Sequence, residues 1–226
     1  MRPGGALGSR AIRGRRTGNV QQRGVGLLVV GVILAGGRGQ RLGGADKALV
    51  PLAGRPLLAH AIARLAPQTD RLALSANGEA ARFAAFGLPV LADPVAGFPG
   101  PLGGILAGLD WAASLGAGFL VSAAVDTPFF PGDLVPRLIV ASQAAGDAGA
   151  IAATPAGAHP TFGLWPVQLR AALRQDLAAG QRRVLQFAQR RGMATAGFPA
   201  TEPDGFFNIN TPDDLAQAEA LLGMPS

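Results

Sequence analysis

Six short apolar runs alternate with segments of helical periodicity, and this alternation limits how the chain can fold. The strongest run, residues 27–34, holds only Leu, Val, Ile and Gly, which is typical of a strand buried on both faces of a parallel sheet. Further strands are predicted at 71–75, 89–92, 117–125, 149–154 and 161–166. Helices are predicted at 56–66, 79–86, 101–115, 134–145, 166–178, 183–191 and 212–222. The pattern predicts a three-layer α/β fold with a mostly parallel sheet.

The positive charge of the chain is confined to its first residues. Residues 1–24 hold six of the twenty basic residues and no acidic one, which leaves fourteen basic against fourteen acidic residues in 25–226. The net charge of +6 and the pI near 11.4 therefore do not indicate a nucleic-acid-binding domain. We expect 1–24 to be a disordered Gly/Arg-rich tail, without the aromatic residues of an RNA-binding arm, and 25–226 to be a single domain.

Several classes of protein are excluded by composition. The chain has no cysteine and two histidines, which rules out disulfides and a cysteine nucleophile and argues against a structural zinc site. The apolar stretch at 25–35 is too short for a membrane span, and cleavage after it as a signal peptide would separate the strand from the loop that follows. We therefore expect a cytoplasmic protein with no membrane or nucleic-acid partner.

Candidate ligand-binding motifs follow three of the predicted strands. A glycine-rich loop after the first strand ends in Asp46 and in Lys47, the only lysine of the sequence. Asp93 follows the third strand and Asp126 the fourth. Open parallel sheets bind ligands at the carboxyl ends of their strands. Because glycine lets backbone N–H groups approach phosphates and lysine adds a compact charge, this edge is predicted to bind a phosphorylated ligand.

The glycine loop matches neither of two common phosphate-binding motifs. A dinucleotide fingerprint needs a third glycine where Leu42 stands, and a P-loop needs Gly before and Ser or Thr after its lysine, where Lys47 has Asp46 and Ala48. Taken alone, the loop leaves open a simple glycine turn with a solvated lysine.

Four motifs occur in order along the chain. They are Leu34-Ala-Gly-Gly-x-x-x-Arg41-Leu-Gly43-Gly-x-Asp46-Lys47, Asp93-Pro94 with Gly100-Pro101-Leu102-Gly103-Gly104-Ile105, Val125-Asp126-Thr127-Pro128, and Asn208-Ile209-Asn210-Thr211-Pro212. Together, over about residues 29–220, they resemble the molybdenum cofactor guanylyltransferase family. The resemblance implies a Rossmann-like nucleotidyltransferase fold and transfer of GMP from GTP to the molybdopterin cofactor, with release of pyrophosphate. Gly39, Leu42 and Val125 depart from the family's usual serine, methionine and cysteine.

The resemblance also implies roles for individual residues. Lys47, Arg41 and Asp126 are expected to be catalytic, with Lys47 at the α-phosphate and Asp126 binding Mg²⁺. The expected nucleotide- and cofactor-binding residues are Leu34, Ala35, Gly36, Gly37, Lys47, Ser75, Asn77, Asp93, Gly100, Pro101, Leu102, Asp126, Arg182, Asn208 and Asn210. Within this set, Arg182, Asn208 and Asn210 are assigned to the pterin side, where His159 and Arg183 are further candidates. A structural role is the alternative for His159 and both asparagines, a solvated helix start for Arg182 and Arg183, a turn for Asp93, and an N-cap or turn for Asp126.

Other functions remain open at this stage. The cytidylyltransferase of the same cofactor or a small sugar-phosphate nucleotidyltransferase would share the motifs, although Gly100–Gly104 and Asp126-Thr-Pro resemble the guanine enzyme. A non-catalytic nucleotide-binding module is a third alternative, which the retained Arg41, Lys47 and Asp126 disfavour. The partners implied are GTP and molybdopterin as substrates, and molybdoenzymes or other cofactor-biosynthesis proteins.

Overall fold

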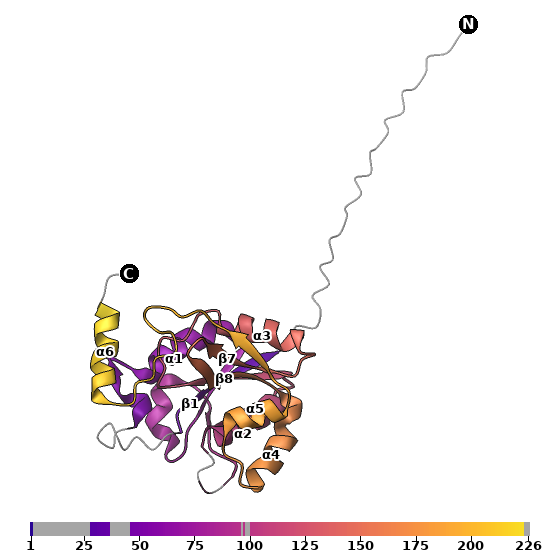
Figure 1. Cartoon of the computed structure of the whole chain (residues 1–226), viewed down its shortest axis with the longest axis horizontal. Coiled ribbons are helices and arrows are strands. Elements are labelled where there is room, and N and C mark those ends of the chain that lie inside the picture. Colours follow the sequence, from indigo (N-terminus) through magenta and orange to yellow (C-terminus); the bar gives the residue numbers. More distant parts are fainter. Residues whose placement is uncertain (2–27, 37–45, 96, 98–99, 224–226) are drawn as a thin grey trace.

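A seven-stranded sheet with the order β5-β4-β1-β6-β8-β7-β9 forms the centre of the molecule (Figure 1). The computed structural model describes residues 1, 28–36, 46–95, 97 and 100–223. The strands are β1 (Val29–Leu34), β4 (Arg71–Ser75), β5 (Val90–Leu91), β6 (Phe119–Ala124), β7 (Ala150–Thr154), β8 (Gly157–Pro166) and β9 (Ala194–Gly197). Only β8 runs antiparallel to its neighbours, β6 and β7. The predicted α/β fold with a mostly parallel sheet is confirmed.

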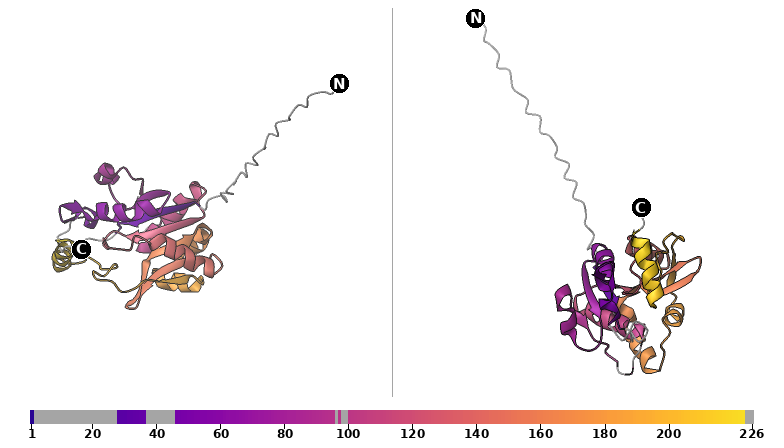
Figure 2. Two further views of the ribbon diagram at one scale, coloured as in Figure 1. Left: turned by 90° about the horizontal axis from the view of Figure 1, so that it is seen from above. Right: turned by 90° about the vertical axis from the view of Figure 1, so that its left-hand side faces the viewer.

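Helices cover both faces of this sheet. On one face lie α1 (Leu57–Leu65) and α3 (Leu134–Ala144), and on the other lie α2 (Pro101–Ser114), α4 (Arg170–Ala178) and α5 (Val184–Arg190). The last helix, α6 (Pro212–Gly223), lies at one end of the molecule in Figure 1 and in the left view of Figure 2. It packs against a small hairpin of β2 (Pro51–Leu52) and β3 (Arg55–Pro56).

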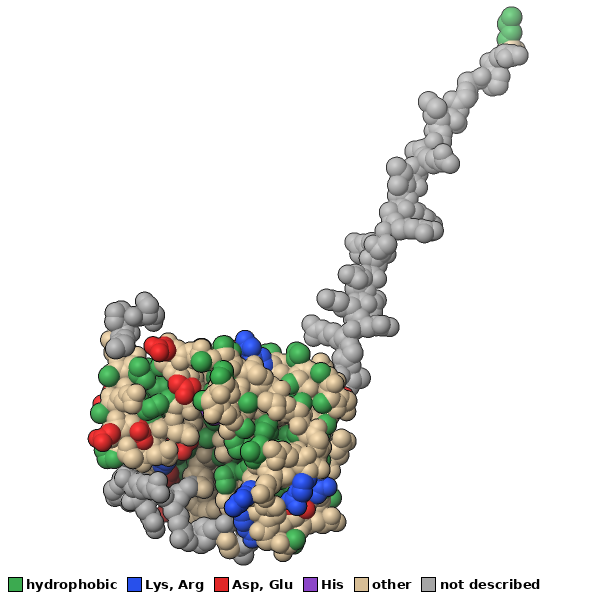
Figure 3. All heavy atoms as spheres, in the orientation of Figure 1, with side chains coloured by type: hydrophobic (Ala, Val, Ile, Leu, Met, Phe, Trp, Pro, Cys, Tyr) green, Lys and Arg blue, Asp and Glu red, His purple; other side chains and the backbone are tan. Residues whose placement is uncertain are grey.

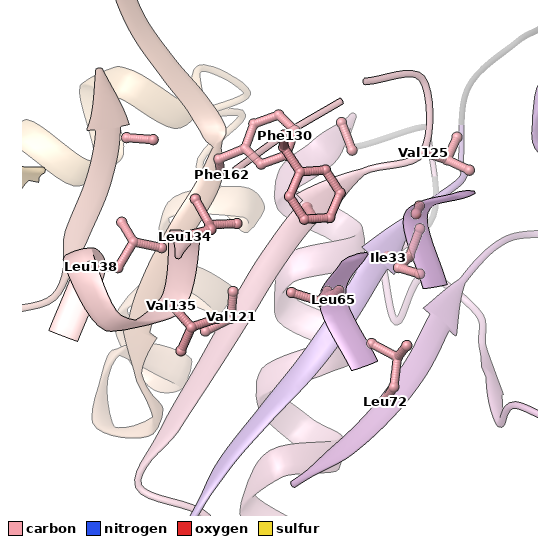
Figure 4. Packing of buried hydrophobic residues seen from close by; sticks show 14 of the residues in the cluster. Ile33, Leu65, Leu72, Val121, Val125, Phe130, Leu134, Val135, Leu138 and Phe162 are labelled. Atoms are coloured by element: carbon pink, nitrogen blue, oxygen red, sulfur yellow. The ribbon is translucent and has the colours of Figure 1, made fainter. Parts of the chain in front are cut away.

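The central strands have apolar residues on both faces because both faces are covered. In β1, Ile33 belongs to the cluster beneath α1 and α3, whereas Val30 and Val32 belong to the cluster beneath α2, α4 and α5. Figure 4 shows Ile33 beside Leu65 in the first of these clusters, to which Phe130 also belongs. Alternate residues of a strand point to opposite faces, which explains why this run is continuously apolar.

Two glycines let α2 pack closely on the sheet. A Cβ at Gly104 would collide with Ser75 Oγ, and one at Gly108 would lie 2.7 Å from a Leu120 methyl carbon. Any side chain at either position would displace the helix or its neighbours. The close approach covers the end of β4, where Ser75 is 2% exposed.

Several elements differ from the sequence prediction. The segment predicted as a helix at 79–86 is the 3₁₀ segment η3 (Ala80–Phe86), and β8 begins at Gly157 rather than at residue 161. The helix predicted at 166–178 is divided into η4 (Val167–Leu169) and α4. The β2–β3 hairpin, β9 and the 3₁₀ segments η1 (Lys47–Leu49) and η2 (Ala66–Gln68) were not predicted.

The short connection between β7 and β8 explains why β8 is antiparallel. Only Pro155 and Ala156 separate the two strands, and a parallel pair needs a crossover of a dozen or more residues. The tail predicted at 1–24 lies, apart from Met1, outside the described residues. Within the described ranges, no helix combines the length and apolar character needed to cross a membrane.

Candidate active site

Lys47 joins two other segments at the carboxyl edge of the sheet. Its Nζ donates to Asp126 Oδ2 and to Asn210 Oδ1, each at 2.7 Å. The side chains of Lys47 and Asp126 are 15% and 25% exposed, so the ion pair is largely shielded yet reachable. The structure thus brings together three of the predicted site residues, separated by up to 163 positions; we call them the Lys47 cluster.

Local structure fixes the backbone on either side of this cluster. Asp46 is the N-cap of η1: its Oδ1 accepts from the Ala48 N–H at 3.1 Å, and the Ala48 side chain is fully buried. Asp126 follows β6, where the Val125 N–H donates to the Leu34 carbonyl at 3.1 Å. The Asp126 carbonyl in turn accepts from the Ile209 N–H at 2.8 Å. These bonds hold the ends of β1 and β6 beside the segment that bears Asn208 and Asn210.

A capping box at the start of α6 holds Asn210. The carboxylate of Asp214 accepts from the N–H groups of Asn210 and Thr211, both at 2.8 Å, and Thr211 Oγ1 accepts from the Asp214 N–H at 3.1 Å. The bond from the Asn210 N–H is the main cause that lowers the pKa of Asp214, and the nearby charge of Lys47 contributes in the same direction. Thr211 is therefore the N-cap of α6.

Asn208 faces a different partner. The buried Thr127 hydroxyl donates to Asn208 Oδ1, which ties the Asp126-Thr127 segment to the segment before α6. Asn208 itself is exposed. Both asparagines of the closing motif are thus bonded to groups at the end of β6 or at Lys47.

A second pair of predicted residues lies at the ends of β4 and β5. Asn77 Nδ2 donates to Asp93 Oδ2 at 2.8 Å, and the Asp93 N–H donates back to Asn77 Oδ1 at 2.9 Å. A Cβ built on Gly36 would lie 4.0 Å from Asn77 Nδ2, so the end of β1 adjoins this pair. We call Asn77 and Asp93 the rim pair.

Arg82, which the sequence did not single out, connects the rim pair to the Lys47 cluster. It lies in η3 and donates from Nε to Asp46 Oδ2 and from a terminal nitrogen to the Asn77 carbonyl, both at 2.6 Å. An arginine in an unremarkable Ala-rich segment matches no motif, so only the three-dimensional arrangement reveals it.

The remaining residues that are expected to bind the nucleotide differ in how deeply they are buried. Arg41 and Gly37 lie outside the described residues. Leu34 is half-buried, Ala35 is buried with its N–H bonded to the Ser75 carbonyl at 2.9 Å, and Gly36 is exposed. Gly100 and Pro101 are exposed at the start of α2. The side chains of Ser75 and Leu102 are instead buried, Ser75 against Gly104 and Leu102 in the core, so direct ligand contact by either side chain stays a prediction.

Two of the pterin-side candidates, Arg182 and His159, have structural partners. One terminal nitrogen of Arg182 donates to the carbonyls of Leu177 and Gln181 at 2.7 and 2.9 Å, beyond the end of α4. The His159 ring stacks on Phe206 with centroids 4.2 Å apart and planes inclined by 7°. Burial lowers the pKa of His159, and the nearby Asp204 partly opposes this shift.

The donor set suits a metal held mainly by its ligand rather than by the protein. No group of three or more His, Asp or Glu residues that could hold a metal occurs in the described ranges. Mg²⁺ is commonly held by one or two carboxylates together with waters and substrate phosphates. Asp126 and the adjacent amide oxygen of Asn210 fit that requirement, and Lys47 pairs with both oxygens here.

Comparison with known proteins identifies the family of the chain. A family profile described as the MobA-like NTP transferase domain matches residues 31–193. A molybdenum cofactor guanylyltransferase of Cereibacter sphaeroides is 55% identical over 198 residues, which cover 87% of this chain and 98% of the relative. One from Bradyrhizobium sp. (strain ORS 278) is 52% identical over 199 residues, covering 87% and 94%.

Solved structures show the same fold. Molybdopterin-guanine dinucleotide biosynthesis protein A from Archaeoglobus fulgidus superposes with a TM-score of 0.67 at 25% identity, over 85% of this chain and 98% of that one. The 2-C-methyl-D-erythritol 4-phosphate cytidylyltransferase from Thermus thermophilus superposes with a TM-score of 0.63 at 20% identity, over 85% and 98%, and shows the fold alone. The chain is therefore an enzyme of the molybdenum cofactor guanylyltransferase family of nucleotidyltransferases.

Proposed function

We propose that this enzyme transfers GMP from GTP to the molybdopterin cofactor and releases pyrophosphate. The observation that supports this most strongly is the Lys47 cluster, where one ammonium bridges a carboxylate and an amide oxygen at the carboxyl edge of the sheet. The two relatives named above are guanylyltransferases rather than cytidylyltransferases, which favours GTP as the nucleotide.

The chemistry of the reaction suits these residues. An oxygen of the molybdopterin phosphate monoester attacks the α-phosphorus of GTP, and the bond from that phosphorus to the pyrophosphate oxygen breaks. The nucleophile is already an anion, so no strong base is needed, and the main obstacle is the meeting of two highly charged groups. Positioning of the two substrates and neutralisation of their charges can therefore account for catalysis.

Lys47 is proposed to neutralise charge at the α-phosphate. A compact ammonium with three donors can bridge oxygens that lie in different directions, whereas a guanidinium presents a planar fork. In the described structure Nζ bridges Asp126 and Asn210, so the ammonium is held between two segments of the site.

Asp126 is proposed to hold Mg²⁺, with Asn210 or Asn208 adding an amide oxygen directly or through water. When bound, the ion would supply further neutralisation of the phosphate oxygens. The backbone of residues 34–37 and Arg41 are proposed to hold the β- and γ-phosphates.

The rim pair and the start of α2 are proposed to bind the nucleoside. Asn77 and Asp93 offer amide and carboxylate groups at an exposed edge, and Gly100 and Pro101 lie exposed at the N-terminus of α2. The backbone at Ser75 and Leu102 is included in this set, since their side chains are buried. On the acceptor side we place Arg182, Asn208 and Asn210. The enzyme would work in the cytoplasm with cofactor-biosynthesis proteins or molybdoenzymes.

The test is release of pyrophosphate by the purified protein with Mg²⁺ and each of GTP, CTP, ATP and UTP, with and without molybdopterin. We expect release only with GTP and only when molybdopterin is present. A preference for CTP would replace the proposal with the cytidylyltransferase function. Binding of GTP without any turnover would favour a non-catalytic nucleotide-binding module.

A further inference from the structure

We propose that Arg82 is a positioning residue that sets the place of Lys47 relative to the nucleoside-binding rim pair. This inference rests on the proposed function, because it assigns Arg82 a role in the same reaction. Arg82 lies in η3, outside every motif that relates the chain to its family.

The guanidinium is held from several directions. It donates to Asp46 Oδ2, to the Asn77 carbonyl and to the Glu79 carbonyl. Its central carbon also lies 4.3 Å from the centroid of the Phe83 ring, which is 1% exposed and part of the core. With 30% of its side chain exposed, Arg82 is more shielded than the surface arginines of α4, such as Arg174 at 49%. Three hydrogen bonds and one contact with a core ring therefore fix its position.

The bond to Asp46 acts on the residue directly before Lys47. The Asp46 carboxylate divides its two oxygens, Oδ1 capping η1 at the Ala48 N–H and Oδ2 accepting from Arg82 Nε. A charge-assisted bond of 2.6 Å restrains Asp46, and through it the first residue of η1, which is Lys47.

The bond to Asn77 acts on the other side of the site. Arg82 holds the Asn77 carbonyl, while the Asn77 side chain is paired with Asp93. One rigid guanidinium thus joins the end of β4 to the residue that precedes Lys47. A lysine at this position has a single ammonium on a flexible stem and lacks the planar fork that spans the two acceptors.

The decisive experiment is a double-mutant cycle with Arg82→Ala, Asp46→Ala and the double variant, measured as kcat and KM for GTP-dependent pyrophosphate release. A displacement of Lys47 by even one ångström predicts a loss in kcat of roughly 10- to 100-fold in each single variant. Because both act through the same bond, the double variant should lose little more than the more impaired single variant. Arg82→Ala should also raise KM for GTP, since Asn77 loses its restraint.

Two further variants keep the test clear of folding effects. Arg82→Lys keeps the charge without the fork and should lose about tenfold or more in kcat. Arg174→Ala removes the surface ion pair, 2.6 Å long, between Arg174 on α4 and Asp110 on α2. This variant should change kcat/KM by less than about twofold. The thermal unfolding temperature of every variant shows whether a loss in kcat comes from unfolding or from displacement of Lys47. If Arg82→Ala does not fold, the kcat of Arg82→Lys decides whether Arg82 positions Lys47.

Two results would overturn the role of Arg82. Losses that multiply in the double variant would mean that Arg82 acts independently of Asp46, and an Arg82→Ala enzyme that matches Arg174→Ala would mean no role in turnover. Failure of the wild-type enzyme to release pyrophosphate with GTP would instead overturn the proposed function, so the two failures are distinguishable.

Discussion

The two halves of the sheet present their candidate residues in different ways. Around β5, β4, β1 and β6, side chains from distant segments bond to one another, as Lys47 does with Asp126 and Asn210. Around β8, β7 and β9, Arg182, which lies between α4 and α5, bonds to the Leu177 and Gln181 carbonyls, and His159 bonds to Thr154 on the neighbouring strand. The first half therefore holds a prearranged charged cluster, whereas the candidates of the second half also support local structure.

This difference predicts where mutations will act. A cluster fixed before the substrate arrives needs little reorganisation as charge develops, so damage to it should appear in kcat. Residues that bind the acceptor after it arrives should affect its KM. Surface charge also differs between the two sides of the molecule. Figure 3 shows acidic side chains over α6 and basic ones over α4 and α5.

The largest effect is expected at Lys47. Lys47→Ala should lower kcat by about 10²- to 10³-fold, because one prearranged cation at the developing charge is removed. Steady-state release of pyrophosphate measures this loss, and thermal unfolding checks that the fold is kept.

Lys47→Arg is the matched control for charge alone. The planar fork should not reproduce the two bonds from one nitrogen to Asp126 and Asn210, so we expect little recovery. Turnover of Lys47→Ala at the wild-type rate would show that Lys47 is not catalytic, and turnover of Lys47→Arg at that rate would show that the positive charge alone is sufficient.

A smaller effect is expected at Arg182, on the acceptor side. Arg182→Ala should raise KM for molybdopterin by about tenfold and leave KM for GTP unchanged, as for loss of one charge-assisted bond near the surface. The control is Arg190→Ala, which removes the exposed ion pair, 3.1 Å long, between Arg190 on α5 and Asp176 on α4. A lower unfolding temperature with no change in either KM would show that Arg182 only caps α4, and the contrast between the halves would sharpen.

The smallest effect concerns the pH dependence of stability at His159. Burial lowers its folded-state pKa below 6.5, so the unfolded chain binds a proton that the folded chain rejects. Stability contributed by the neutral ring is therefore complete above pH 6.5, falls as the pH decreases from there to the folded-state pKa, and is constant below it.

The variant His159→Phe keeps a ring for stacking on Phe206 and removes this titration. Urea unfolding near pH 7.5 and near pH 5 should show that the wild type loses more stability on acidification than the variant. Asp214, whose pKa is lowered from 3.8, titrates below this window. Equal losses in both proteins would show that His159 does not titrate as described.

Elements with a strong apolar pattern could be predicted from the sequence. The strand at 71–75 was predicted with the bounds that it has in the structure, and the buried strands β1 and β6 were found within two residues at each end. The short elements could not be predicted. The β2–β3 turn places Ala53 and Gly54 at φ of 47° and 76°, and the pair Ala-Gly is a weak turn signal. In β9, the sequence Ala-Thr-Ala-Gly lacks an apolar run, so its strand conformation depends on pairing with β7.

The candidate site was predictable where it lies in motifs. Lys47, Asp126 and Asn210 come together although the first and last are 163 residues apart, because Asp126 lies at the end of β6 and the segment before α6 bonds to it there. Contacts made through ordinary residues gave no signal. Arg82 and Asp214 orient Asp46 and Asn210 from a 3₁₀ segment and a helix cap, which only the fold brings to the site.

The most direct test of the central claim is a product analysis with molybdopterin, GTP and Mg²⁺. We expect the wild-type enzyme to form the guanine dinucleotide of molybdopterin and pyrophosphate in equal amounts, and Lys47→Ala to form neither at a comparable rate. Formation of a cytosine dinucleotide in preference, or equal product from Lys47→Ala, would contradict it.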